Sequence, residues 1–182
     1  MEWISSIFIA LIVAILISIF VIQPSSVFGH SMEPTLNEGD WVIISRLTNT
    51  LSMDYDYEDI VIIDSNVSKK HTKIDDFLFI FKYNGLTNYL FDQQPIERYW
   101  IKRIIGKAGD TISFIDGEVY RNGHKLDEPY IKEGVTYAPF PSIKVPENTV
   151  FVLGDNRNNS GDSRILGPIP IENVLGKMIY SF

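Results

Sequence analysis

The sequence contains no cysteine, which excludes disulfide bonds, thiolate zinc sites and cysteine nucleophiles. Histidine is also scarce. The only three, His30, His71 and His124, do not have the i, i+4 spacing of a helical metal site. We therefore expect no metal centre, and we find no motif that indicates a cofactor.

Positive charge is in short supply as well. The chain has 16 Lys and Arg against 23 Asp and Glu, which gives a formal net charge of −7 and a pI near 4.9. No Lys/Arg cluster is longer than Lys69-Lys70. A protein that binds DNA or RNA through the phosphate backbone needs a basic face, so we expect no nucleic-acid partner.

One long apolar run stands at the N-terminus. From Trp3 to Ile22 there is no charged residue. At about 1.5 Å per residue, this run would span about 30 Å as a helix, which matches the apolar core of a bilayer. The run predicts a transmembrane anchor over residues 1–23, with the lipid bilayer as a partner. Its charge pattern does not indicate the orientation, because the first cation after the run is Arg46.

A cleavable signal peptide and a buried core helix both fit this run less well. A signal peptide usually has a basic start and an apolar core of about 7–15 residues. Here the chain starts Met1-Glu2, and Gln23-Pro24-Ser25-Ser26 offers no small-x-small cleavage pattern. A buried core helix would show a polar face, and this run has none.

The remaining residues, 24–182, are enough for one domain and have a β pattern throughout. Asp116-Gly117 and Asn122-Gly123 are strong hairpin signals, and residues 107–148 are predicted to form a small excursion from the main sheet. No later segment shows a sustained helical period. The predicted strands are Trp41–Ser45, Ile60–Asp64, Phe77–Tyr83, Tyr99–Ile105, Thr111–Ile115, Glu118–Arg121 and Thr149–Leu153.

A first candidate for chemistry is the segment Gly29 to Leu36, just after the apolar run. Ser31 is flanked by Gly29 and Pro34, and such a turn can expose a hydroxyl beside backbone N–H groups that stabilise an oxyanion. A serine in a Gly/Pro turn is also ordinary loop composition. Taken alone, this segment does not decide between a nucleophile and a plain loop.

A second candidate is the predicted strand that contains Trp100, Lys102, Arg103 and Ile104. Its two cations point to opposite faces of an otherwise apolar strand. They fit an edge strand whose cations reach water, or else a desolvated lysine beside Trp100 and Ile104. Lowering a lysine pKa to near 8 costs roughly 3 kcal/mol, which burial can supply, and a neutral Lys102 could then take the proton of Ser31.

A third candidate is the polar loop from Gly154 to Arg164, which directly follows an apolar run. Its composition is that of a solvated surface loop. The loop could also hold a site from behind. In that case Asp155 would pair with Arg103, Asp162 would pair with Arg164, and Ser160 would hydrogen-bond the amine of Lys102.

Together, and in this order behind an apolar N-terminal segment, the three motifs resemble those of bacterial type I signal peptidases of the short Gram-positive form. The serine motif Ser-Met-x-Pro-Thr-Leu is Ser31–Leu36, and the lysine motif Lys-Arg-x-x-Gly-x-x-Gly-Asp is Lys102–Asp110. The last motif, Gly-Asp-Asn-Arg-x-Asn-Ser-x-Asp-Ser-Arg, is Gly154–Arg164. The resemblance implies a mainly β fold: an N-terminal transmembrane helix followed by an antiparallel β catalytic domain of the signal peptidase and LexA-like type.

The resemblance also implies a role for each residue of the motifs. Ser31 would be the nucleophile, Lys102 the general base, and Ser160 the group that orients the lysine. The Ser31 N–H and a group near Gly29 would form the oxyanion hole, because this chain lacks the Ser that some members carry at position 29. The implied structural ion pairs use Arg103, Asp155, Asp162 and Arg164, and the substrate groove would be lined by Val27, Leu36, Val42 and Ile101.

The implied activity is removal of signal peptides from exported preproteins by cutting after small residues at −1 and −3. The catalytic domain would lie on the extracytoplasmic side of the bacterial cell membrane, attached by a single span. Two alternatives stay open: an inactive membrane-anchored paralogue that binds preproteins, and a LexA-like self-cleaving protein. We reject a Ser-His site at His30, because adjacent residues in an extended turn point apart. The sequence does not indicate an oligomeric state.

Overall fold

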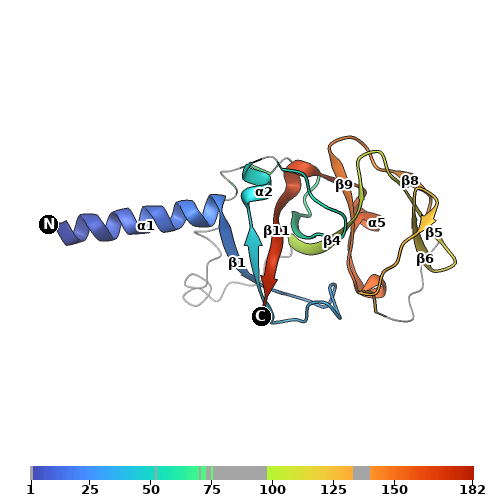
Figure 1. Cartoon of the computed structure of the whole chain (residues 1–182), viewed down its shortest axis with the longest axis horizontal. Coiled ribbons are helices and arrows are strands. Elements are labelled where there is room, and N and C mark those ends of the chain that lie inside the picture. Colours follow the sequence, from blue (N-terminus) through green and yellow to red (C-terminus); the bar gives the residue numbers. More distant parts are fainter. Residues whose placement is uncertain (1, 52, 70, 73–74, 76–97, 133–139) are drawn as a thin grey trace.

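The computed structural model describes residues 2–51, 53–69, 71–72, 75, 98–132 and 140–182. It shows a helix that projects from one end of a domain built from two antiparallel β-sheets (Figure 1). The strand predicted over Phe77–Tyr83 lies outside the described residues.

The N-terminal helix α1 covers Glu2–Phe20, and the described side chains from Trp3 to Phe20 are exposed. The apolar run does not continue as helix to its end, because β1 begins at Ile22. Pro24 has no N–H for a helix and drives the residue before it into extended backbone. Within the described part of the chain, no helix is long and apolar enough to cross a membrane, so the predicted transmembrane anchor is not confirmed.

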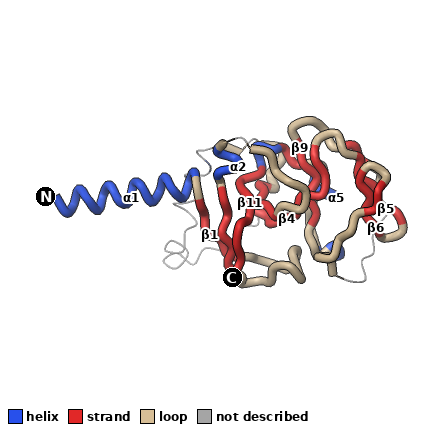
Figure 2. Tube along the Cα trace, in the orientation of Figure 1, coloured by secondary structure: helices blue, strands red, loops and turns tan. Residues whose placement is uncertain are grey.

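The main sheet has seven strands in the order β1-β2-β11-β3-β4-β9-β10, and every neighbouring pair is antiparallel. Figure 2 shows these strands side by side in the body of the domain. Their bounds are β1 Ile22–Ser26, β2 Trp41–Ser45, β3 Ile60–Asp64, β4 Tyr99–Lys107, β9 Thr149–Leu153, β10 Ile169–Pro170 and β11 Val174–Ser181.

The smaller sheet has the order β7-β6-β5-β8 and is built within the predicted excursion, at the end of the molecule away from α1 (Figure 1). The hairpin signals have their expected geometry, since Asp116 and Asn122 adopt positive φ, as do the glycines that follow them. The strands are β5 Thr111–Ile115, β6 Glu118–Arg121, β7 His124–Lys125 and β8 Ile143–Lys144.

Among the described residues, the helices after α1 are short. They are the α-helices α2 Leu47–Thr50 and α5 Ser163–Leu166 and the 3-10 turns η1 Arg157–Asn159 and η2 Ile171–Asn173. Asp162 caps α5 and accepts a hydrogen bond from the Arg164 N–H. This cap orients the end of the polar loop that follows β9.

Three apolar clusters hold these elements together. The first includes Val27, Met32 and Leu36, and it packs the chain on either side of Ser31 against the main sheet. The second fills the space around β3, β4 and β9, and the third joins β9 to the smaller sheet. The three motif segments thus meet where the first two clusters approach each other along β4.

Candidate active site

Ser31 lies in a turn after β1 whose apolar neighbours are fixed in the core. Met32 and Leu36 each have 1% of their surface exposed, and the Leu36 N–H donates to the Met32 carbonyl at 3.0 Å. Ser31 itself is half-buried. The two buried side chains anchor the turn, and this fixes the position of the Ser31 hydroxyl.

Lys102 lies on β4 opposite Val61 of β3, and only 3% of it is exposed. Its Nζ donates to the Oγ of Ser31 at 2.6 Å and to the carbonyl of Ile101 at 2.8 Å. The ammonium also lies 5.6 Å from the ring centre of Trp100. The lysine amine is therefore in direct contact with the serine hydroxyl in a site that is nearly closed to water.

This environment changes the acidity of the lysine. The pKa of Lys102 is lowered from 10.5 to about 8, chiefly by burial; Asp162 and Asp155 oppose this shift, and Arg164 contributes to it. Burial dominates because a charged ammonium loses its hydration in the interior. A substantial fraction of Lys102 is thus neutral near pH 8, where it can accept a proton.

The loop after β9 packs directly on the serine turn. The Asn156 N–H donates to the Ser31 carbonyl at 3.0 Å, and its Nδ2 donates to the His30 carbonyl at 3.0 Å. A Cβ on Gly154 would lie 2.5 Å from the Ser31 carbonyl oxygen and 2.2 Å from Ser160 Oγ. Position 154 has no room for a side chain, so Gly allows this close approach.

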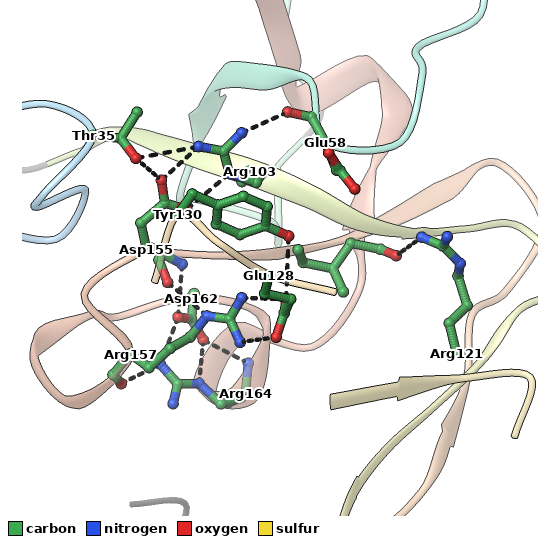
Figure 3. Close-up of polar contacts among 12 residues, drawn as sticks. Thr35, Glu58, Arg103, Arg121, Glu128, Tyr130, Asp155, Arg157, Asp162 and Arg164 are labelled. Carbon is green, nitrogen blue, oxygen red and sulfur yellow. Dashed lines mark hydrogen bonds and ion pairs between the residues drawn. The ribbon is translucent and has the colours of Figure 1, made fainter. Parts of the chain in front are cut away.

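Arg103 and Asp155 form a buried ion pair behind the serine turn (Figure 3). The guanidinium donates to both carboxylate oxygens, at 2.9 and 2.6 Å, and also to the carbonyl of Glu58 at 3.0 Å. Thr35 Oγ1 donates to Asp155 at 2.5 Å. This pair joins β4, the serine turn and the loop after β9.

Asp162 and Arg164 form a second pair within that loop (Figure 3). Arg164 donates to the two carboxylate oxygens at 2.8 and 2.7 Å. Asp162, which is fully buried, also accepts from the Gly154 N–H at 3.1 Å. The pair therefore holds the loop in place at Gly154, the residue that packs against the serine turn.

Comparisons with known proteins identify the family of the chain. The whole chain, residues 1–182, matches the family described as signal peptidase, peptidase S26. The chain belongs to this family. It is 33% identical to a signal peptidase I of Bacillus licheniformis, covering 100% of this chain and 87% of that protein. It is 34% identical to signal peptidase I T of Bacillus subtilis (strain 168), with 100% and 84% covered.

A solved structure of a signal peptidase I from Enterococcus faecalis V583 is also similar, with 25% identity and a TM-score of 0.45 over 69% of this chain and 97% of that one. Family membership makes the protein a serine peptidase, and therefore a hydrolase. The resemblance predicted from the three motifs is thereby confirmed at the level of the family.

The remaining predicted site residues have the following positions. The Ser160 hydroxyl donates to the Gly161 carbonyl at 3.3 Å, and the described hydrogen bonds include none between Ser160 and Lys102. The Gly29 N–H donates to the Glu38 carboxylate at 3.3 Å, so it would have to leave Glu38 to serve an oxyanion. The roles of Ser160 and Gly29 stay predictions.

The predicted groove residues are mostly core residues in this structure. Val27, Leu36 and Val42 have 3%, 1% and 0% of their surface exposed, so they lie beneath the surface and do not line it. Ile101 is partly buried against the same cluster. A substrate side chain can reach only exposed atoms, so Ile101 is the one of the four that offers surface directly.

The imidazole ring of His30 lies between two carboxylates. Its Nδ1 lies 2.7 Å from Glu33 Oε1 and its Nε2 lies 3.5 Å from Glu38 Oε2. Both ring nitrogens therefore face acidic side chains on the surface, which fits the rejection of a Ser-His site. Among the described residues, no cluster of three or more His, Asp or Glu side chains is suitable for a metal ion.

Sequence reasoning missed several residues that hold the site. Thr35 lies in the serine motif and Asn156 in the last motif, so their membership in these motifs was a signal that could have singled them out. Glu128 and Tyr130 lie in the excursion and contact Arg157 and Arg103 (Figure 3). No local pattern marks these two, because their partners are brought close only by the tertiary fold.

Proposed function

We propose that this protein is a membrane-anchored endopeptidase that removes signal peptides from exported preproteins by a Ser31/Lys102 dyad, cutting after small residues at −1 and −3. The observation that carries the proposal is the 2.6 Å contact between Lys102 Nζ and Ser31 Oγ. A nucleophile and a base within hydrogen-bond reach are what covalent acyl transfer requires.

In the acylation step, neutral Lys102 accepts the Ser31 proton while Oγ attacks the carbonyl carbon of the scissile peptide. The C–O bond forms and the carbonyl electrons move to the oxygen, where the Ser31 N–H is a suitable donor. Collapse of this intermediate breaks the C–N bond. The Lys102 ammonium gives its proton to the departing amine, so the mature N-terminus leaves as a neutral group.

In the deacylation step, water replaces the amine. Lys102, neutral again, accepts a proton from the water as its oxygen attacks the ester carbonyl. The ester C–O bond then breaks and the proton returns to Ser31 Oγ, which releases the signal peptide with a free carboxylate. One amine thus serves both halves of the reaction.

We propose that α1 anchors the domain to the bacterial cell membrane as a single span, with the domain on the extracytoplasmic face. Its support is the uncharged run Trp3–Ile22 and the exposure of the helix's apolar side chains, for example 85% for Trp3 and 69% for Ile7. Exposed apolar surface of this extent is stable only when it is covered by another apolar phase.

The test is to incubate the detergent-solubilised protein with a preprotein that has Ala at −3 and −1, and to sequence the N-terminus of the product. We expect one new N-terminus directly after the −1 Ala. A bulky residue at −1 should prevent the cut, and Ser31→Ala should yield no product. Binding of the preprotein without any cut would instead identify an inactive binding paralogue.

A further inference from the structure

A buried ion pair joins the smaller-sheet region to the loop after β9. Glu128, in the segment between β7 and β8, accepts hydrogen bonds from Arg157 at 3.1 and 2.5 Å (Figure 3). The side chains are 6% and 0% exposed, respectively. A two-point contact of this kind between a guanidinium and a carboxylate fixes the geometry as well as the charge.

Arg157 also contacts the backbone of the loop after β9. Its Nε donates to the Gly154 carbonyl at 3.0 Å, and its own carbonyl accepts from Arg164 at 2.7 Å. Gly154 in turn packs against the Ser31 carbonyl and Ser160 Oγ. A displacement of Arg157 therefore moves the peptide against which the serine turn rests.

Tyr130, two residues after Glu128, makes a parallel connection to β4. The Arg103 guanidinium lies 3.9 Å from the centre of its ring, and the tyrosine hydroxyl donates to Glu128 at 3.2 Å. A cation over an aromatic face is attracted most strongly where water is excluded. Arg103 is the neighbour of Lys102 on β4 and the partner of Asp155, so Tyr130 contacts the buried ion pair that holds the serine turn to β4.

We propose that Glu128 and Tyr130 are positioning residues: together they clamp the loop after β9 and Arg103 so that Ser31 and Lys102 stay in contact and water stays out. They do not touch the reacting atoms. The proposal rests on the proposed dyad, and it gives two residues from beside the smaller sheet a part in the activity of the site on the main sheet.

The first test is kinetic. Glu128→Gln keeps the volume and removes the charge, and we expect kcat on a peptide substrate to fall about 10- to 100-fold with little change in KM, because small displacements of reacting groups are costly. Tyr130→Phe, which keeps the ring over Arg103, should lose less than Tyr130→Leu. The double variant Glu128→Gln/Arg157→Gln should lose less than the sum of the two single variants, because both changes remove the same Glu128–Arg157 ion pair.

The second test does not require cleavage. Lys102 is acylated with an amine-reactive reagent at a series of pH values, and mass spectrometry measures the labelled fraction. The midpoint of labelling reports the pH at which the amine becomes neutral. Burial sets its pKa at about 8, while Asp162, Asp155 and Arg164 remain around it in every variant. When Glu128→Gln loosens the loop, water reaches the ammonium, so the labelling midpoint should move to higher pH. Tyr130→Leu should move it the same way.

Asp64→Asn is the matched control. Asp64 is a fully buried carboxylate at the end of β3 that pairs with Arg98 and accepts from His71 at 2.9 Å. We expect this variant to lose thermal stability while keeping the wild-type kcat and the wild-type labelling midpoint.

Each outcome decides between a positioning role and a structural one. If Glu128→Gln or the Tyr130 variants are destabilised like Asp64→Asn but keep wild-type kcat and labelling, the positioning role is overturned. If Glu128→Gln does not fold, the Phe and Leu variants of Tyr130 decide. If the wild-type protein cleaves no preprotein, the proposed function fails. The labelling midpoint then still decides the positioning role.

Discussion

The amine of Lys102 lies 2.6 Å from the hydroxyl of Ser31, although 71 positions separate the two residues in the chain. The contact exists because β4 carries the lysine past the turn that follows β1, and the loop after β9 closes over both. Lys102 is 3% exposed, so its reactivity and its effect on stability have the same origin in burial.

Removal of either member of the pair should abolish cleavage. We expect Ser31→Ala and Lys102→Ala each to lose the activity, and the double variant to lose no more than either single one, because the two groups act in one proton transfer. Lys102→Arg should be inactive too, since a guanidinium stays protonated. Substantial cleavage by any of the three single variants in the preprotein assay would disprove the dyad.

Activity should rise with pH through the pKa of Lys102. Since burial lowers this pKa to about 8, the acid limb of kcat/KM should lie near that pH, with activity lost as the lysine becomes protonated below it. His30→Ala should leave the limb in place. A limb near the histidine range of about 6.5 that disappears in His30→Ala would instead favour a Ser-His site.

The same lysine should reduce stability. Its pKa is lower in the folded state, so the unfolded state binds more protons between about pH 8 and 10.5, and stability should increase with pH in that window. Lys102→Met should stabilise the fold at pH 7 by about 3 kcal/mol, with a smaller gain above pH 8. Urea unfolding measures this. The exposed Lys144→Met is the control and should show no such dependence.

Asn156 should matter for rate without taking part in the chemistry. Asn156→Ala removes the hydrogen bond to the His30 carbonyl, so we expect kcat to fall about tenfold while the fold is kept, because the nucleophile loses a lateral support. Asn159→Ala changes an exposed residue at the end of η1, the turn that Asn156 precedes, and should have wild-type kinetics. Equal kinetics for both variants would show that the Asn156 side chain is dispensable.

The catalytic domain should need all of β1. Ile22–Ser26 pairs along its full length with β2, and Arg46 donates to Gln23 at 2.8 Å. A chain that begins at Val21 should fold and cleave a soluble peptide but lose rate on a membrane-inserted preprotein. A chain that begins at Ser25 should unfold at a lower temperature. Equal melting temperatures by circular dichroism would argue against a structural role for β1.

Strands with a clear alternation or apolar run were predictable from the sequence. Ile60–Asp64 and Thr149–Leu153 have the expected bounds. The strand β11 was missed, although it joins β2 to β3 in the main sheet. Its register shifts against both neighbours, and Gly176 lies where a Cβ would be 2.5 Å from the Ser45 carbonyl. These irregularities break the period of two that marks a strand in the sequence.

The site was predictable to the extent that its residues are in contiguous motifs. Ser31 and Lys102 could be singled out because their neighbours carry the pattern. The surface available for a substrate was not, since Val42 is apolar like a groove residue but lies fully in the core. Hydrophobicity in a sequence does not tell a pocket wall from the layer beneath it.

The connection between α1 and β1 is short, and it couples the helix to the sheet. Val21 alone separates them, and both of its backbone groups are engaged: its N–H donates to the Ile17 carbonyl, and its carbonyl accepts from the N–H of Arg46, the residue after β2, each at 2.8 Å. We expect a change in the tilt of α1 to rotate β1 with it. Because the turn that carries Ser31 follows β1, the direction of the helix axis would then set the height and the orientation of the Ser31 hydroxyl.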